Sequence, residues 1–402
     1  MRISTLTIFE RNTSSLNRQQ SDFLKVGQQF ATGKRVINPS DDPQAASRAV
    51  GVGQAKAITQ QYMDARITAR NALAQEESVL NSISDAVISA KTLLVQGANG
   101  TLSDADRSSV AAELKSIYET LYGQANVTDG NGRYLFAGYQ DNSAPFIKDA
   151  AGKVSYVGGN TAREQRVDAS RLMPVADNGN TVFRSVHSSA GYIAEAAADN
   201  AGTLTFSGPL VLNSSDANYG ASFTLSFTEN ADGSYSYSTD GGASLLTYEP
   251  GQPIEFAGLS LTLEGIPADG DSIQLGTAQN MNPDLFASLE KAIAVLDTAV
   301  AGDPKQQAQL DNTLKTVMRE LDNSLDNVLT VRASVGARLN ELDVIDTVAG
   351  NRMLNYEQTL SDLLDLDYVQ AAAEYSLRMV GLQAAQKSFV DIQGMTLFNY
   401  LN

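Results

Sequence analysis

An apolar residue recurs at every seventh position, in one register, from residue 314 to residue 363 of this chain. The eight positions are Leu314, Leu321, Val328, Val335, Leu342, Ala349, Tyr356 and Leu363. A seven-residue repeat of this length is typical of a long helix packed in coiled-coil fashion along another helix. Asp303 followed by Pro304 is a cap with proline at the first helical position, so the helix is expected to begin there.

The first third of the chain predicts a second long helix. Asp42 before Pro43 is again a cap followed by proline, and apart from Gly51 and Gly53 there is no helix breaker until Gly97. The later half carries one heptad row and part of the alternate row, namely Leu73, Leu80, Val87 and Leu94, with Ile83 and Ala90. Residues 103–106 resemble a capping box and predict a further helix to about residue 127. Helix resumes near Asn282-Pro283, which has the same form of cap.

Two shorter helices are expected at the ends of the chain. The first stops at Gly33, and Asp365 or Asp367 caps the last. Each has one thin apolar stripe with nothing local to cover it, so each needs a partner helix. The candidates are the other terminal helix and the same helices of neighbouring subunits. The predicted assembly interface is Phe9, Leu16, Phe23, Phe30, Tyr368, Tyr375, Leu382, Phe389 and Ile392.

The middle of the chain changes to a period of two. Residues 223–227 and 234–238 alternate strictly around a turn at 230–233, which predicts a hairpin, and residues 203–206 and 259–263 alternate likewise. We expect a multidomain α+β protein, in which a long coiled-coil-like helical bundle carries an inserted β-rich domain, sandwich-like or barrel-like. The expected domains are 1–40 with 365–402, 41–145 with 281–364, and the insert at 146–280.

The formal net charge of −17 argues against nucleic-acid binding, because such binding depends on neutralising phosphates. The charge is uneven. Residues 1–40 hold 6 basic and 2 acidic side chains, whereas residues 281–402 hold 9 and 17. Either the charged side chains lie on solvated helix faces, or the basic N-terminal end and the acidic C-terminal end attract each other.

The N-terminal residues have no apolar run followed by a cleavage site, so no cleaved secretory signal is expected. No stretch is expected to reach the ~18 apolar residues of a membrane span. If the protein is extracellular, it leaves the cell by a route that uses no cleaved signal.

Residue types that carry catalysis or bind metals are sparse. His187 is the one histidine and there is no cysteine, so metal-ligand and catalytic-triad patterns are lacking and His187 is expected at the surface. Gly51 and Gly53 lack the third glycine of a dinucleotide loop. Residues 129–132 resemble the start of a calcium loop without its distal glutamate, so a plain turn is favoured. No cofactor and no enzymatic activity are expected.

Four separated segments resemble the flagellin superfamily, in the form found in proteins that join hook and filament. They are residues 32–46 (TGKRVINPSDDPQAA), 131–139 with 144–146 (NGRYLFAGY and APF), 332–340 (RASVGARLN) and 397–401 (LFNYL). The resemblance covers about residues 1–146 and 283–402 but not the middle.

The resemblance implies a structural subunit of the bacterial flagellum that is exported through the flagellar type III apparatus, with both termini packed in an inner tube. It implies contacts with hook-associated protein 1, with flagellin and with its own copies in a tubular layer. It also implies a cytoplasmic export chaperone that holds a terminal segment.

Two alternatives remain open. The chain could be flagellin itself, although flagellins usually carry Ala where this chain has Pro43 and end in a Leu-Leu-Arg-like tail. It could also be a secreted enzyme with a catalytic β domain, against which the single histidine and the absence of cysteine weigh.

Overall fold

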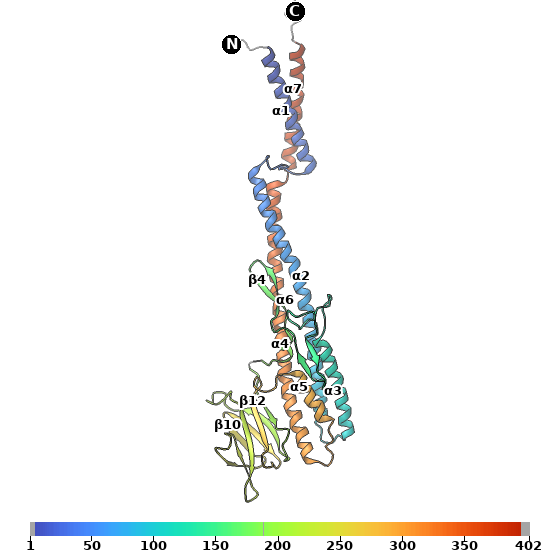
Figure 1. Cartoon of the computed structure of the whole chain (residues 1–402). Helices are drawn as coiled ribbons and strands as arrows, with labels where there is room; N and C mark the ends of the chain where they lie inside the picture. The colour runs from blue at the N-terminus through green and yellow to red at the C-terminus, as the bar shows by residue number, and fades with distance from the viewer. Residues whose placement is uncertain (1–4, 188, 395–402) are drawn as a thin grey trace, which may run out of the picture. The chain divides into compact units, whose positions relative to one another are not determined.

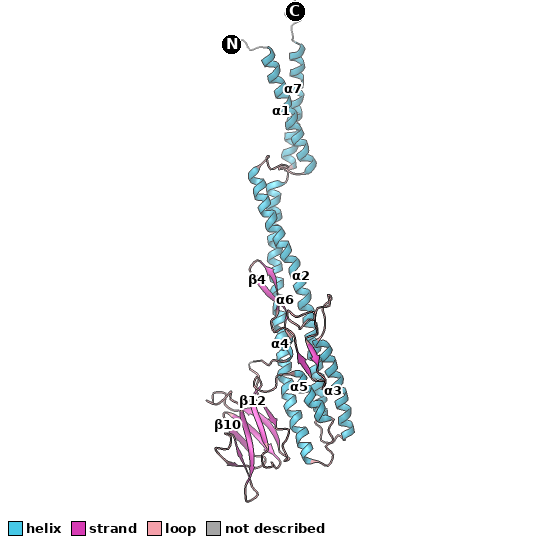
Figure 2. Ribbon diagram, in the orientation of Figure 1, coloured by secondary structure: helices cyan, strands magenta, loops and turns pink. Residues whose placement is uncertain are grey.

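The computed structural model describes residues 5–187 and 189–394 (Figure 1). Its helices are α1 (Thr5–Thr32), α2 (Pro43–Gly97), α3 (Asp104–Ala125), α4 (Gly179–Phe183), α5 (Leu285–Leu296), α6 (Pro304–Leu364) and α7 (Tyr368–Gly394). Its strands are β1 (Phe146–Lys148), β2 (Val154–Tyr156), β3 (Arg163–Asp168), β4 (Arg171–Ala176), β5 (Tyr192–Ala196), β6 (Thr205–Val211), β7 (Phe223–Glu229), β8 (Tyr235–Ser238), β9 (Leu246–Thr247), β10 (Pro253–Phe256), β11 (Leu259–Glu264) and β12 (Ser272–Thr277). Helices occupy both ends of the sequence and strands its middle, as expected (Figure 2).

The helix starts follow their capping residues. The Asp42 side chain accepts the Ala45 N–H at 3.0 Å, and Asp303 accepts those of Lys305 and Gln306. Ser103 and Asp106 form the predicted capping box at the start of α3. The expected start at Asn282-Pro283 is wrong: α5 begins at Leu285, because Asp284 accepts the N–H groups of Phe286 and Ala287 and is the N-cap.

The chain divides into two compact units. Unit 1 comprises residues 1–64 and 344–402, and unit 2 comprises residues 65–343, so α2 and α6 each contribute to both. The three-part division expected from the sequence stays a prediction.

The heptad positions of α2 and α6 form the buried centre of unit 2. Leu73, Leu80, Leu321, Val328 and Val335 have no exposed surface, and α3 and α5 pack against each other beside them. A second apolar cluster is aromatic, in which the ring centroids of neighbouring members lie 5.2–5.7 Å apart: Phe136, Phe146, Phe183 and Phe286. Residues 146–183 are therefore packed onto the helices.

A two-sheet sandwich accounts for residues 192–277. One antiparallel sheet has the strand order β10-β11-β6, the other β5-β12-β7-β8-β9, and side chains from both share one core. The predicted hairpin is present as β7 and β8, paired from Ser226–Ser238 to Glu229–Tyr235. The sequence places one β-rich domain at 146–280, whereas β1–β4 form two separate two-stranded hairpins. Alternation of apolar and polar residues in the sequence predicts strands, but it does not show whether a strand packs in the sandwich or against the helices.

Helix α6 holds the sandwich through polar side chains. Asn312 accepts the Phe206 N–H at 3.1 Å and donates to the Leu204 carbonyl at 2.8 Å, and Thr316 donates to the Ala194 carbonyl at 2.7 Å. The chain enters and leaves the sandwich at one point, where the Ala278 N–H donates to the Gly191 carbonyl at 3.1 Å.

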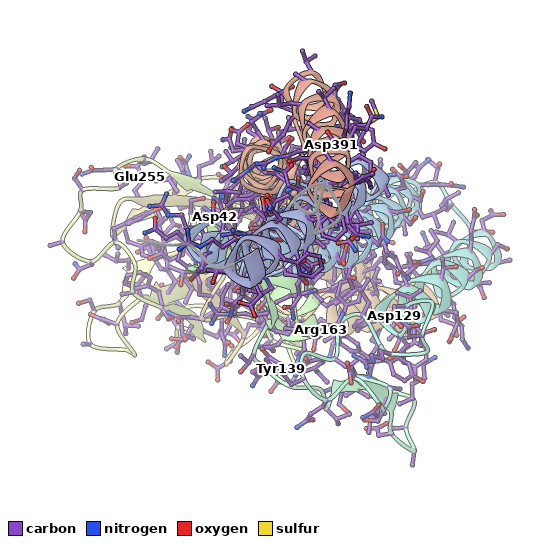
Figure 3. The ribbon with its side chains drawn as sticks, turned by 90° about the horizontal axis from the view of Figure 1, so that it is seen from above. Asp42, Asp129, Tyr139, Arg163, Glu255 and Asp391 are labelled. Atoms are coloured by element: carbon purple, nitrogen blue, oxygen red, sulfur yellow. The ribbon has the colours of Figure 1, made fainter. Side chains whose placement is uncertain are left out.

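The segment that resembles a calcium loop is a turn. The Asp129 carboxylate accepts the N–H groups of Asn131 and Arg133, which fills one oxygen with main-chain donors. Partial burial acts to raise the pKa of Asp129, but these donors outweigh it and hold the pKa below its usual range. Close by, Arg163 pairs with Asp141 at 3.0 Å, and Tyr139 Oη accepts the Glu164 N–H. Figure 3 labels Asp129, Tyr139 and Arg163. Among the described residues no group of acidic, histidine or cysteine side chains could hold a metal ion.

One expectation about membranes needs correction. Helix α2 contains a window long and apolar enough to cross a membrane by length and composition. The core helix of a soluble protein passes the same test, and Leu73, Leu80 and Leu94 of α2 are fully buried in the protein.

Candidate assembly interface

Helices α1 and α7 of unit 1 lie side by side and are joined by an aromatic ladder (Figure 1). The ring centroids of Phe23 and Tyr375 are 4.8 Å apart, and those of Phe9 and Phe389 are 5.5 Å apart. Phe30 contacts both Tyr375 and Tyr368, at 5.8 and 5.9 Å. Such pairs contribute roughly 0.5–1.5 kcal/mol each beyond their buried area. The two heptad stripes thus cover each other within one chain.

The turn after α1 fixes where the two helices meet. Gly33 has a φ of +67°, and a Cβ at that position would lie 2.8 Å from Tyr368 Oη. The Leu366 N–H donates to the Gly33 carbonyl, and the Arg35 N–H donates to the Leu364 carbonyl at 2.7 Å. Only glycine fits this left-handed, closely approached position without strain, which explains why the apolar stripe of α1 ends there.

Two neighbouring carboxylates hold the connection between α1 and α2. Asp41 accepts the N–H groups of Ile37 and Asn38 and pairs with Lys25 at 2.9 Å. Asp42 caps α2 and pairs with Arg35 at 3.2 Å. Hydrogen bonds from main-chain N–H groups, and then these cations, hold the pKa of each carboxyl below its usual range. Asp41 and Asp42 therefore stabilise the connection and the start of α2, as expected for carboxylates that precede a helix beginning with proline.

Attraction between opposite charges contributes less to the contact between α1 and α7 than aromatic packing does. An ion pair between them joins Asp22 of α1 to Arg378 of α7 at 2.9 Å, so the acid lies on the basic N-terminal arm. Both partners are substantially exposed, and exposed pairs contribute about 0–1 kcal/mol. Aromatic packing is the larger contribution.

Helix α7 has a second apolar side that α1 does not cover. Val369 is 83 % exposed and Leu377 70 %, and Val380 and Val390 are also exposed. Val369, Leu377 and Val380 are spaced as residues on one helical face. Helix α1 differs, because its exposed side is mostly polar, with Leu24 and part of Phe9 as exceptions.

The predicted interface residues fall mainly on the covered side. Leu16, Phe23, Phe30, Tyr375, Leu382 and Phe389 are half-buried, while Phe9 and Tyr368 are more exposed. The Ile392 side chain lies outside the described residues. Reasoning from the heptad missed Val26, which is buried, and the outer face of α7. That face could have been found from the sequence, since α7 is apolar at positions outside its main heptad row.

The lone histidine is exposed, as expected, and its Nδ1 lies 2.7 Å from Ser189 Oγ. No carboxylate is bonded to it within the described ranges, so that part of the chain offers no acid–base pair at this histidine.

Comparison with known proteins identifies the class first. Residues 3–141 match the family profile of the bacterial flagellin N-terminal helical region. This match indicates a flagellar protein whose N-terminal helices are of the flagellin type.

Full-length relatives then identify the family. The chain is 35 % identical over 398 residues to flagellar hook-associated protein 3 of Escherichia coli K12, and 34 % identical to that of Salmonella typhimurium LT2, covering 99 % of both chains in each case. This chain belongs to the flagellar hook-associated protein 3 family, whose members form the junction between the hook and the filament.

Solved structures agree. The chain is similar to FlgL of Xanthomonas campestris, at 30 % identity and a TM-score of 0.66, over 77 % of this chain and 99 % of that one. It is also similar to hook-associated protein 3 of Legionella pneumophila, at 25 % identity and a TM-score of 0.70, over 78 % of this chain and 98 % of that one. Neither the flagellin alternative nor the secreted-enzyme alternative is favoured by these matches.

Proposed function

We propose that the chain joins hook to filament through the outer face of α7, which packs on neighbouring subunits once α1 has covered the inner face. The observation that carries this proposal is that α7 is apolar on two sides, and among the described residues of unit 1 one side is covered by α1 while the other is exposed. Exposed apolar residues gathered on one helix need a covering surface in the assembled state. Six of the nine residues predicted from the heptads form the aromatic contacts between α1 and α7, and we propose that this pairing presents the outer face to neighbouring subunits: Phe9, Phe23, Phe30, Tyr368, Tyr375 and Phe389.

The proposed partners are those that the family resemblance implies. We propose hook-associated protein 1 on one side, flagellin on the other and further copies of this chain in a tubular layer. Contacts that repeat head to tail around an axis close into a ring or continue as a helix.

A cytoplasmic export chaperone is proposed to bind α7 before assembly. An exposed apolar helix invites aggregation, and an amphipathic helix lying in a partner's groove is a common way to mask it. The final location is proposed to be outside the cell, reached without a cleaved signal peptide, and no catalytic role is proposed.

Two leucines of α7 separate the two faces experimentally. Leu382→Asp places a carboxylate in the half-buried contact with α1, whereas Leu377→Asp places one on the exposed side. We expect Leu377→Asp to leave the α1–α7 pair intact, as measured by hydrogen exchange, and yet to abolish filament attachment. Leu382→Asp should disturb both the α1–α7 pair and filament attachment, because burying an unpaired carboxylate costs at least about 2 kcal/mol.

The control is Gln383→Asp, an exposed polar position next to Leu382. Electron microscopy of flagella and an assay of flagellin released into the medium measure assembly. Normal filaments in the Leu377→Asp strain would contradict the proposal that the outer face is used.

A further inference from the structure

Glu76 of α2 is a fully buried carboxyl group that the assembly interface does not use. Its Oε1 accepts the backbone N–H of Asp177 at 2.9 Å, and its Oε2 has no hydrogen-bond partner among the described residues. Asp177 is itself buried and lies in the connection between β4 and α4. Buried polar atoms are nearly always paired, so a half-satisfied carboxyl needs an explanation.

One guanidinium lies near these two acids, and it bonds to Asp177. Arg338 of α6 donates from Nη2 to both oxygens of Asp177, at 3.1 and 2.8 Å, and also contacts the Ser334 hydroxyl and the Pro174 carbonyl. The charged groups that face Glu76 are Asp177 and Arg338. Its neighbour on α2, Glu77, pairs instead with Arg332 at 3.4 Å. Since Asp177 takes the guanidinium, a second negative charge at Glu76 would be buried without a direct partner.

Burial, and then the Asp177 charge, raise the pKa of Glu76 to about 8. The folded protein therefore binds a proton here that the unfolded chain releases near its ordinary pKa of 4.5. Stability falls with pH wherever the folded state binds more protons. The contribution of this group is thus most favourable below about pH 4.5, declines as the pH rises towards 8, and is constant above that.

We propose that Glu76 forms a pH-sensitive contact that holds the β4–α4 connection on α2, firm while the carboxyl is protonated and loosened when it ionises. The contact lies within unit 2, and the proposal is independent of how subunits assemble. The part of unit 2 that would respond to pH is α4 together with the end of β4.

The experiment compares hydrogen exchange of residues 171–183 in the wild-type protein, Glu76→Gln and Glu77→Gln between pH 5 and pH 9. Glutamine keeps the acceptor for the Asp177 N–H and cannot ionise. Because variants are compared at the same pH, the intrinsic pH dependence of exchange cancels. We expect the ratio of the wild-type exchange rate to that of Glu76→Gln to be smallest at pH 5, to rise by up to about tenfold per pH unit, and to level off near pH 8.

Glu77→Gln, one residue away, should follow the wild type. A ratio that stays flat from pH 5 to pH 9 would overturn the proposal. If Glu76→Gln fails to fold, carbon-13 NMR of the wild-type glutamate carboxyls decides the matter: a carboxyl that titrates well above pH 6 and responds with the Asp177 amide supports the proposal, and the absence of any such carboxyl refutes it.

Discussion

Gly33 shows how one residue sets the position of two helices. Its left-handed backbone strains any other residue, and the Tyr368 hydroxyl, 2.8 Å from an added Cβ, would have to shift. Gly27, six residues earlier in α1, has no atom within 4 Å of an added Cβ. The two glycines therefore look alike in the sequence and differ in the fold.

Gly33→Ala is expected to destabilise the α1–α7 pair by about 1–3 kcal/mol, the usual cost of a left-handed non-glycine residue. Hydrogen exchange of the α1 amides should accelerate roughly 5- to 150-fold, with no change in α3 or α5. Gly27→Ala is the matched control and should slow exchange slightly, since alanine favours the helix by roughly 0.5–1 kcal/mol. Equal behaviour of the two variants would contradict this account.

At the scale of single elements, the capping box of α3 fixes where that helix begins. The Ser103 hydroxyl accepts the Asp106 N–H, and the Asp106 carboxylate accepts the Ser103 N–H. The same carboxylate also accepts from the Ser103 hydroxyl at 2.7 Å, and these Ser103 contacts lower the pKa of Asp106.

Ser103→Ala is expected to destabilise unit 2 by about 1 kcal/mol, which lowers its melting temperature by about 2–4 °C. Ser109→Ala, an exposed serine of α3 that bonds only to the Ala105 carbonyl, should change stability by less than about 0.5 kcal/mol. Calorimetry of both variants tests the difference. A larger loss for Ser109→Ala than for Ser103→Ala would show that the capping box is not what stabilises the start of α3.

Elements with a long period or an explicit cap could be predicted from the sequence, because their signal is local. Both bounds of α2 and the start of α6 are examples. The start of α5 could not, since Asn282 and Asp284 are equally good caps until the partner N–H groups are known. For the interface, the heptads predicted that each terminal helix needs a partner, with the other terminal helix and the helices of neighbouring subunits as the candidates. They could not show that α7 has a further uncovered side, because a heptad row describes one contact at a time.

At the scale of the whole molecule, the sandwich is an insertion with a single point of attachment to the chain. Gly191 and Ala278 are hydrogen-bonded to each other, so a short linker can bridge the gap at little entropic cost. Its charge supports an outward-facing position, as residues 192–277 hold 11 acidic side chains and no basic ones. Asn312, Lys315 and Thr316 of α6 are polar and can be hydrated where the sandwich is removed.

Replacing residues 192–277 with a short Gly/Ser linker is expected to leave the helices folded and filaments attached. Replacing residues 150–278 instead removes Phe183, which packs on Phe136, Phe146 and Phe286, and loss of such a ring costs roughly 3–5 kcal/mol. Circular dichroism melts and electron microscopy of flagella compare the two. A folded, secreted shorter deletion without filaments would show that the sandwich is part of the joint.

The adjacency of Gly191 and Ala278 also bears on how such a chain can change over generations. A recombination event with both ends at this site would exchange, shorten or remove the outer domain in one step. The caps and the heptad rows of the long helices would be unchanged, and only the α6 surface around Asn312 and Thr316 would meet the new domain. Descendants could then present unlike surfaces to their surroundings while inheriting the same scaffold.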